Sequence, residues 1–66
     1  MVNTGKALRI AMAANNLKNI DLATKMKVSP VQVSYWRSRD SISMSTIIRL
    51  AEIFHMKASE FIALGE

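Results

Sequence analysis

The side chains of this 66-residue sequence with the clearest chemical use lie between Ser29 and Ser38. If this segment is a helix with Val33 turned inward, a step of about 100° per residue turns a largely uncharged set outward. This set, with its flanks, consists of Val31, Gln32, Ser34, Tyr35 and Ser38. Exposed helix faces are normally charged, whereas this one carries methyl groups, a phenol, hydroxyls and an amide. Such a face can make apolar contacts and hydrogen bonds to an external ligand.

Positive charge is concentrated in the same half of the chain. The segment 1–39 contains seven basic residues and one acidic residue, which gives +6, whereas 40–66 contains two basic and four acidic residues, which gives −2. The whole chain therefore carries +4. This asymmetry favours a polyanionic partner. The polar and basic residues expected around the uncharged face are Lys18, Asn19, Lys25, Lys27 and Arg39.

An uncharged face inside a basic rim is typical of nucleic-acid recognition. In the major groove, apolar groups pack on the thymine methyl group, and Ser, Gln and Tyr side chains hydrogen-bond to base edges. The surrounding cations contact phosphates, which adds affinity without sequence information. The alternative is that Val31 and Tyr35 pack against another protein chain.

Residues for catalysis or metal binding are scarce. The sequence has no cysteine, and its one histidine, His55, cannot form a zinc or iron site by itself. Glu52 and His55 share a helix face without an activated nucleophile, so we expect no enzyme, metal site, cofactor or small-molecule ligand. The longest apolar run, Ile10–Ala14, is too short to cross a membrane, and no secretory signal is present. We therefore expect a cytoplasmic protein without membrane contact.

Caps and breaks divide the chain into five short helices, and no useful length shows strand alternation, so we predict an all-α fold. The predicted ranges are 4–14, 19–26, 29–38, 45–55 and 58–64. The third helix has the clearest start, because Ser29 is a good N-cap, Pro30 suits the first position and Gln32 completes a capping box. The predicted core consists of Leu22, Ala23, Met26, Val33, Trp36, Ile47 or Ile48, Leu50, Ala51, Phe54, Phe61 and Leu64.

The turn between the second and third helices is short. The segment Met26–Ser29 leaves too little chain for an antiparallel pair, and it suits the crossing of a helix-turn-helix unit over about residues 19–38. Trp36 then shares the inward side with Val33. We expect it in the core rather than stacked on nucleic acid.

The apolar and small residues of this chain occur in an order and at a spacing that can be compared with known families. The set consists of Leu22-Ala23, Val28-Ser29, Val33-Ser34 with Trp36, and Leu50-Ala51 before Phe54 and Phe61. It resembles the Cro/C1-type helix-turn-helix family, which includes lambdoid phage repressors and Cro proteins, restriction–modification controllers and many antitoxins. The resemblance extends from about Leu8 to Leu64, and Val28–Trp36 is especially similar to the recognition helix of phage repressors. It implies a compact, five-helix, lambda-repressor-like DNA-binding domain.

The resemblance also implies which residues contact DNA. The base-contacting positions fall on Pro30, Val31, Ser34 and Tyr35, and we add Gln32, which lies beside them. The phosphate-contacting set, which combines the family's positions with adjacent polar residues, is Lys18, Asn19, Lys27, Ser29, Ser38, Arg39 and Ser41. Members of this family usually bind pseudo-palindromic operators as dimers, so the implied partners are an operator in double-stranded DNA and a second copy of the chain.

The start and end of the second helix depart from the family pattern. The usual Thr or Ser cap is Lys18, so either Asn19 caps the helix or its terminus is poorly capped. The glycine common in the turn is Lys27, which must take a left-handed backbone conformation at some cost.

Two further departures concern the third helix. The family often pairs an arginine in the first helix with a glutamate late in the third, but these positions are Met12 and Arg37. Met12 is then expected to pack on the aliphatic stem of Arg37. Arg39 replaces the common glycine after the third helix, which leaves the geometry of the following loop open.

The length of the chain bears on its function. Since the sequence begins at Met1 and ends just after the fifth predicted helix, we expect one domain, residues 1–66, with no effector domain. This favours a Cro-like repressor that occupies its operator and blocks polymerase. A restriction–modification controller or another small transcriptional activator is one alternative. The other is an antitoxin- or antirepressor-type protein-interaction module, for which the apolar residues without a clear core role would provide surface: Ile10, Ile20 and Met44.

Overall fold

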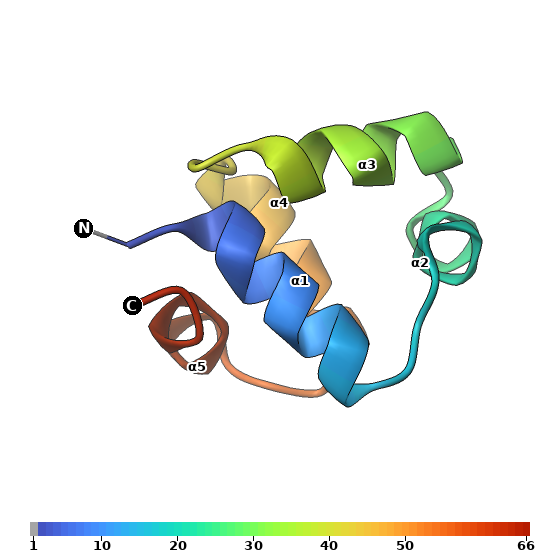
Figure 1. Ribbon diagram of the computed structural model, residues 1–66. Coiled ribbons are helices and arrows are strands. Elements are labelled where there is room, and N and C mark those ends of the chain that lie inside the picture. Colours follow the sequence, from blue (N-terminus) through green and yellow to red (C-terminus); the bar gives the residue numbers. More distant parts are fainter. Residues whose placement is uncertain (1) are drawn as a thin grey trace.

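Figure 1 shows an all-α fold in which α1 crosses the middle of the view. The computed structural model describes residues 2–66, and in this range it contains five helices and no strand. They are α1 (Thr4–Ala14), α2 (Asn19–Met26), α3 (Pro30–Ser38), α4 (Met44–Ile53) and α5 (Ala58–Ala63). Helix α1 packs against α3 and α5, α2 packs against α3 and α4, and α4 packs against α5. Among these residues, no helix is long and apolar enough to cross a membrane.

Side-chain caps fix the starts of α1 and α3. Asn3 Oδ1 accepts a hydrogen bond from the Lys6 N–H at 2.9 Å, and Ser29 Oγ accepts one from the Gln32 N–H at 3.3 Å. The predicted N-cap at Ser29 and the proline at the first position of α3 are therefore confirmed. The capping box is only half formed, because no hydrogen bond from the Ser29 N–H to the Gln32 side chain occurs within residues 2–66.

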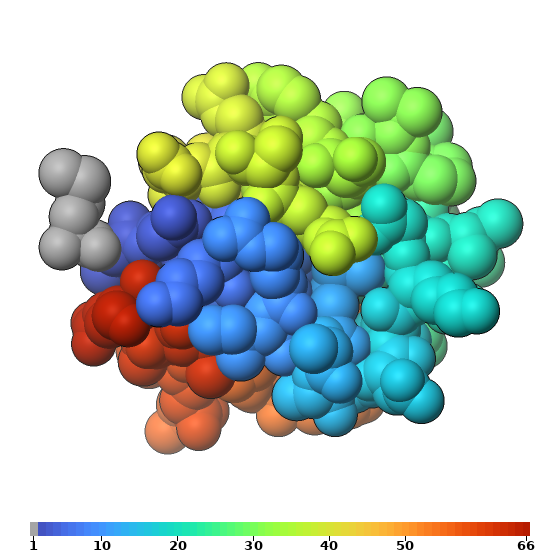
Figure 2. Space-filling view, in the orientation of Figure 1, coloured from blue at the N-terminus to red at the C-terminus, as the bar shows by residue number. Residues whose placement is uncertain are grey.

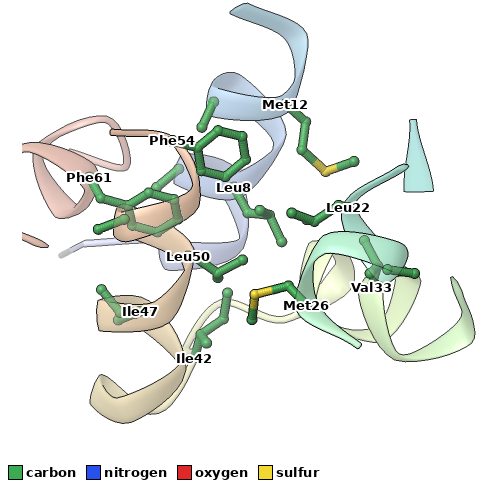
Figure 3. Packing of buried hydrophobic residues seen from close by; sticks show 14 residues of the cluster. Leu8, Met12, Leu22, Met26, Val33, Ile42, Ile47, Leu50, Phe54 and Phe61 are labelled. Carbon is green, nitrogen blue, oxygen red and sulfur yellow. The ribbon is translucent and has the colours of Figure 1, made fainter. Parts of the chain in front are cut away.

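The core consists of apolar side chains from every helix and of two residues outside the helices, Ile42 and Phe54 (Figure 3). Its buried members are Ala7, Leu8, Ala11, Met12, Leu22, Ala23, Met26, Val33, Ile42, Ile47, Leu50, Ala51, Phe54 and Phe61. Ile47 is buried and Ile48 is exposed, which resolves the alternative that the pattern left open. Trp36 and Leu64 are half-buried and pack against this cluster. Ile42 was missed because it lies in a predicted loop, where helical periodicity gives no information.

Three helices are followed by residues with a left-handed backbone. Asn16, Lys27 and His55 have φ angles of 57°, 58° and 57°. The left-handed conformation predicted for Lys27 is thus confirmed. Because His55 also leaves the helical region, α4 ends at Ile53, two residues before the predicted end, and it begins one residue early, at Met44. A left-handed residue at this place lets the terminal carbonyl groups find new partners.

The chain after α3 passes unusually close to the start of α1. A methyl group on Gly5 would lie 1.8 Å from the carbonyl oxygen of Arg39. Any residue with a Cβ atom would therefore push the two backbones apart. The glycine is needed for this approach rather than for a special φ angle.

Thr4 holds the same loop by hydrogen bonds. Its N–H donates to the Asp40 carbonyl oxygen at 3.0 Å, and its buried Oγ1 accepts from the Ile42 N–H at 2.6 Å. The loop amide of Ile42 is buried, so it needs a partner that the loop backbone does not supply. This contact also turns the Ile42 side chain into the core.

We predict that Gly5→Ala destabilises the protein by about 1–3 kcal/mol, because the added methyl group must displace the backbone of Arg39. Urea unfolding followed by circular dichroism measures this change. Lys6→Ala is the matched control, since Lys6 is exposed on the same helix and its side chain can be shortened without a clash. Equal stability of the Gly5→Ala variant and the wild type would contradict the close approach.

We predict that Lys27→Gly stabilises the protein by about 0.5–1 kcal/mol. The left-handed conformation costs a non-glycine residue about 1–2 kcal/mol, and the greater freedom of glycine in the unfolded chain offsets part of this gain. Thermal unfolding measures the change, and His55→Gly, at the same φ angle in another turn, should give a similar gain. A loss of stability in both variants would show that these residues make compensating contacts.

Candidate nucleic-acid interface

The outer face of α3 is exposed and largely uncharged, as predicted. Val31 is 77% exposed and Tyr35 is 51% exposed, whereas Val33 is completely buried. Pro30 and Ser34 are also exposed, and Gln32 is half-buried at the edge of the face. In Figure 2, α3 (green) forms the upper edge of the molecule and adjoins α2. The inward orientation of Val33, from which the outward set was derived, is therefore confirmed.

The carboxyl end of α3 is held by a residue of α1. The Arg9 Nη1 group donates a hydrogen bond to the carbonyl oxygen of Arg37, in the last turn of α3. Such carbonyl groups have no partner within their own helix, and the helix dipole favours a cation beside them. Arg9 therefore serves as a cap that links the two helices. No sequence pattern indicates this contact, because the two residues lie far apart in the chain.

Of the two possibilities that the sequence left open for the start of α2, the structure shows the poorly capped terminus, because the N-cap residue Lys18 makes no side-chain cap hydrogen bond. The ammonium group of Lys18 can only donate hydrogen bonds, so it cannot accept one from a helix N–H. The Asn19 Oδ1 atom accepts a hydrogen bond from Arg37 Nη1 at 2.7 Å. Asn19 thus links α2 to α3 instead of capping α2, and the suggestion that it caps the helix is wrong. The contact found at this terminus comes from Asp21, whose Oδ2 atom accepts from the Lys18 N–H at 3.0 Å.

Arg37 occupies the position at which a carboxylate was expected from the family pattern. It is half-buried, and its buried Nε atom has no hydrogen-bond partner among the described residues. Its Nη1 atom donates to an amide oxygen, that of Asn19, rather than to a carboxylate. Met12, the other residue of the altered pair, is 3% exposed and belongs to the core.

A residue of α4 also holds the turn between α2 and α3. The Arg49 Nη2 group of α4 donates to the carbonyl oxygen of Met26, the last residue of α2, at 3.0 Å. Within the turn, the Val28 N–H donates to the Ala23 carbonyl oxygen at 3.0 Å. The left-handed conformation of Lys27 makes the second contact possible. The angle between the two helices is therefore fixed by α4 as well as by the turn itself.

Two residues with different predicted roles contact each other. The Arg39 Nη1 group donates to the phenolic oxygen of Tyr35 at 2.9 Å, and its guanidinium carbon lies 5.2 Å from the centroid of the tyrosine ring. Sequence analysis assigned Tyr35 to bases and Arg39 to phosphates. The structure brings them together on the outer side of α3.

The remaining predicted phosphate-contacting residues surround α3. Lys18 and Asn19 lie at the start of α2, Lys27 and Ser29 flank the turn, and Ser38 and Ser41 lie at and beyond the end of α3. All except the half-buried Asn19 are exposed. Within residues 2–66 there is no pocket and no cluster of His, Cys, Asp and Glu suited to a metal ion. The candidate interface is thus a convex helix face with a polar and basic rim.

Arg39 leaves α3 in an extended conformation, with φ −90° and ψ 144°. The replacement of the family's glycine therefore places no strained residue here, which settles the loop geometry that the sequence left open. The Arg39 N–H donates to the Trp36 carbonyl oxygen at 3.2 Å.

Comparison with known proteins assigns the chain to a family. A family model described as Helix-turn-helix matches residues 6–61, which is most of the chain. No curated protein and no solved structure matches it. The matched segment begins in α1 and ends in α5, and it includes the α2–turn–α3 unit described above. The protein therefore belongs to the Cro/C1-type helix-turn-helix family of DNA-binding transcription regulators.

Proposed function

We propose that this protein is a Cro-like repressor that binds a pseudo-palindromic operator in double-stranded DNA as a homodimer. The observation that carries the proposal is the exposed, uncharged outer face of α3, with Val31 77% exposed, inside a rim of exposed lysines. Val31 and Tyr35 lie one helical turn apart and form an exposed apolar patch, and such a patch favours a partner surface. In helix-turn-helix proteins this helix enters the major groove.

In this proposal the first turns of α3 contact the bases. Val31 packs on a thymine methyl group, and Pro30 lies beside it at the start of the helix. Ser34, Gln32 and Tyr35 hydrogen-bond to base edges. Each of these side chains is held by a helix rather than by a loop, which limits the freedom that would be lost on binding.

The rim contacts the DNA backbone. Lys18 and Lys27 are exposed on either end of α2 and pair with phosphates, and the Ser29, Ser38 and Ser41 hydroxyl groups donate to phosphate oxygens. The Nδ2 group of Asn19 remains available for a similar contact, because only its Oδ1 atom is used by Arg37. These contacts supply affinity that falls as the salt concentration rises.

Repression follows from occupancy, since a dimer on an operator excludes polymerase from the overlapping promoter. Activation from a neighbouring site, as by a restriction–modification controller, is the alternative regulatory outcome. Action on bacterial or phage operators places the protein in the bacterial cytoplasm. The single domain proposed for residues 1–66 provides both DNA binding and the contact between copies.

Exposed apolar side chains outside α3 favour a second candidate function. Ile20 is 62% exposed and Met44 is 56% exposed, while Ile10, at 38%, is only marginally so. An antitoxin- or antirepressor-type module would bind a protein partner with such residues. The dimer contact in the first proposal would use them equally well, and the exposed face of α3 supports DNA binding.

Selection of bound sequences from a random double-stranded DNA pool at moderate salt tests the proposed function. We expect enrichment of an inverted repeat whose half-site centres lie about 10–11 base pairs apart, because two copies of α3 must reach the same side of the DNA. Enrichment of a single half-site would support DNA recognition without dimerisation. A folded protein that enriches no sequence would refute the proposal and favour the protein-interaction module.

We predict that Val31 discriminates thymine from uracil. In the selected duplex, replacement of the contacted thymine by deoxyuridine removes one methyl group, and the wild type should bind about fourfold more weakly, from about 0.8 kcal/mol per buried carbon. Val31→Ala should bind both duplexes alike. Fluorescence anisotropy titrations measure the affinities, and discrimination retained by Val31→Ala at every thymine would show that Val31 contacts no methyl group.

We predict a different result for Lys18→Ala. This variant should bind the thymine and uracil duplexes more weakly by the same factor, because a phosphate contact carries no base information. The slope of log affinity against log salt concentration should fall by about 1. An unchanged slope would place Lys18 away from the DNA backbone.

A further inference from the structure

Tyr35 and Arg39 form one exposed pair at the carboxyl end of α3. The guanidinium group lies over the ring, with its central carbon 5.2 Å from the ring centroid, and donates to the phenolic oxygen at 2.9 Å. The two residues are four apart, a spacing that brings side chains together after one helical turn. Val31 precedes Tyr35 by the same spacing. The pair therefore continues the proposed base-contacting face beyond the end of the helix.

The backbone that carries the pair is held in place. The Arg39 N–H donates to the Trp36 carbonyl oxygen at 3.2 Å, and the Arg39 carbonyl lies against Gly5, where no Cβ atom would fit. The next residue, Asp40, accepts from the Thr4 N–H at 3.0 Å. The backbone of Arg39 is thus held in place. The contact of its side chain with Tyr35 orders the tyrosine ring, which has only two rotatable side-chain angles, so little conformational entropy is lost on binding.

The hydrogen bond between the two side chains determines what they offer to a base. The phenolic oxygen accepts from Arg39, which directs its own O–H group to donate elsewhere. The guanidinium group has five N–H groups and no acceptor, and only one of them is used by Tyr35. The pair is therefore rich in donors. In the major groove, guanine presents two acceptors, N7 and O6, whereas adenine presents one acceptor and one donor.

We propose, on the basis of the proposed function, that Tyr35 and Arg39 act as one recognition unit that selects guanine at one position of each half-site. Arg39 is then a specificity-determining residue, whereas sequence analysis placed it among the phosphate contacts. The hydrogen-bond donors of this pair are satisfied by a base edge that presents only acceptors, as guanine does in the major groove. An adenine amino group at the same position would face these donors and leave them unpaired.

The test compares the wild type with Tyr35→Phe, Arg39→Ala, Arg39→Lys and the Tyr35→Phe/Arg39→Ala double variant. Each protein is used for selection from the random duplex pool. Its affinity is then measured for the wild-type consensus duplex, for a guanine-to-adenine duplex, and for one with 7-deazaguanine, which lacks only the N7 acceptor. Thermal unfolding checks that each variant is folded, and we expect it to be, since both side chains are exposed.

We expect the wild type to prefer guanine to adenine at this position by about tenfold, within the range for a paired base contact. Each single variant should lose most of this preference. The double variant should lose no more of it than the more affected single variant does, because the two residues act as one unit. Preferences at the other positions should remain. Lys57→Ala is the matched control, because it removes an exposed charge next to α5, which packs on α1 and α4. It should leave the guanine preference unchanged.

Arg39→Lys separates the two roles of Arg39. Lysine keeps the positive charge and can contact a phosphate, but it lacks the planar fork that stacks on the ring and donates to the phenol. If Arg39→Lys retains the guanine preference and Arg39→Ala weakens all duplexes alike, Arg39 is a phosphate contact and this inference is wrong, while the proposed function stands. Enrichment without guanine at any Tyr35-dependent position also overturns the inference. A wild-type protein that enriches no sequence refutes the proposed function, and this inference with it.

Discussion

The geometry of the candidate interface depends on how α3 is attached to the rest of the protein. Of the nine residues of α3, Val33 alone is fully buried, and the half-buried Trp36 packs against the core, so apolar packing holds this helix by one narrow face. Polar contacts at its two ends complete the attachment: Arg49 donates to the Met26 carbonyl oxygen at the turn before α3, and Arg9 donates to the Arg37 carbonyl oxygen in its last turn. Because the helix is held by one buried face and by its ends, its outer face is free to carry residues chosen for a ligand.

Three arginines that sequence analysis would count toward a basic surface serve as links between helices. Arg9, Arg37 and Arg49 each donate to a carbonyl or amide oxygen of another helix. Their charge still contributes to the long-range field that attracts a polyanion, but those donors are already used. In the proposed function, the exposed lysines supply the direct phosphate contacts. The structure thus separates the arginines that link helices from the cations that are free for a partner.

Much of the fold was predictable because the relevant signals are local. The limits of α1, α2 and α3 follow from caps and turn residues, and Ser29 caps the helix that it was expected to cap. The orientation of α3 follows from a single choice, Val33 inward, because helical geometry then places Val31 and Tyr35 outward. The end of α4 was placed two residues late, since nothing in its sequence pattern marks His55 as left-handed.

The sequence by itself thus determined the helices, their caps and the composition of the exposed face, because these depend on residues within one or two turns of each other. The tertiary structure decided which polar groups pair. Asn19 was free to cap α2 as far as the sequence shows, but packing of α2 on α3 places Arg37 within 2.7 Å of its oxygen. The Tyr35–Arg39 contact likewise depends on the direction in which the chain leaves α3, and that direction is imposed by α1. A hydrogen-bond donor pairs with whichever acceptor the packing of the helices brings near it. Which acceptor that is depends on the tertiary structure and cannot be read from the local sequence.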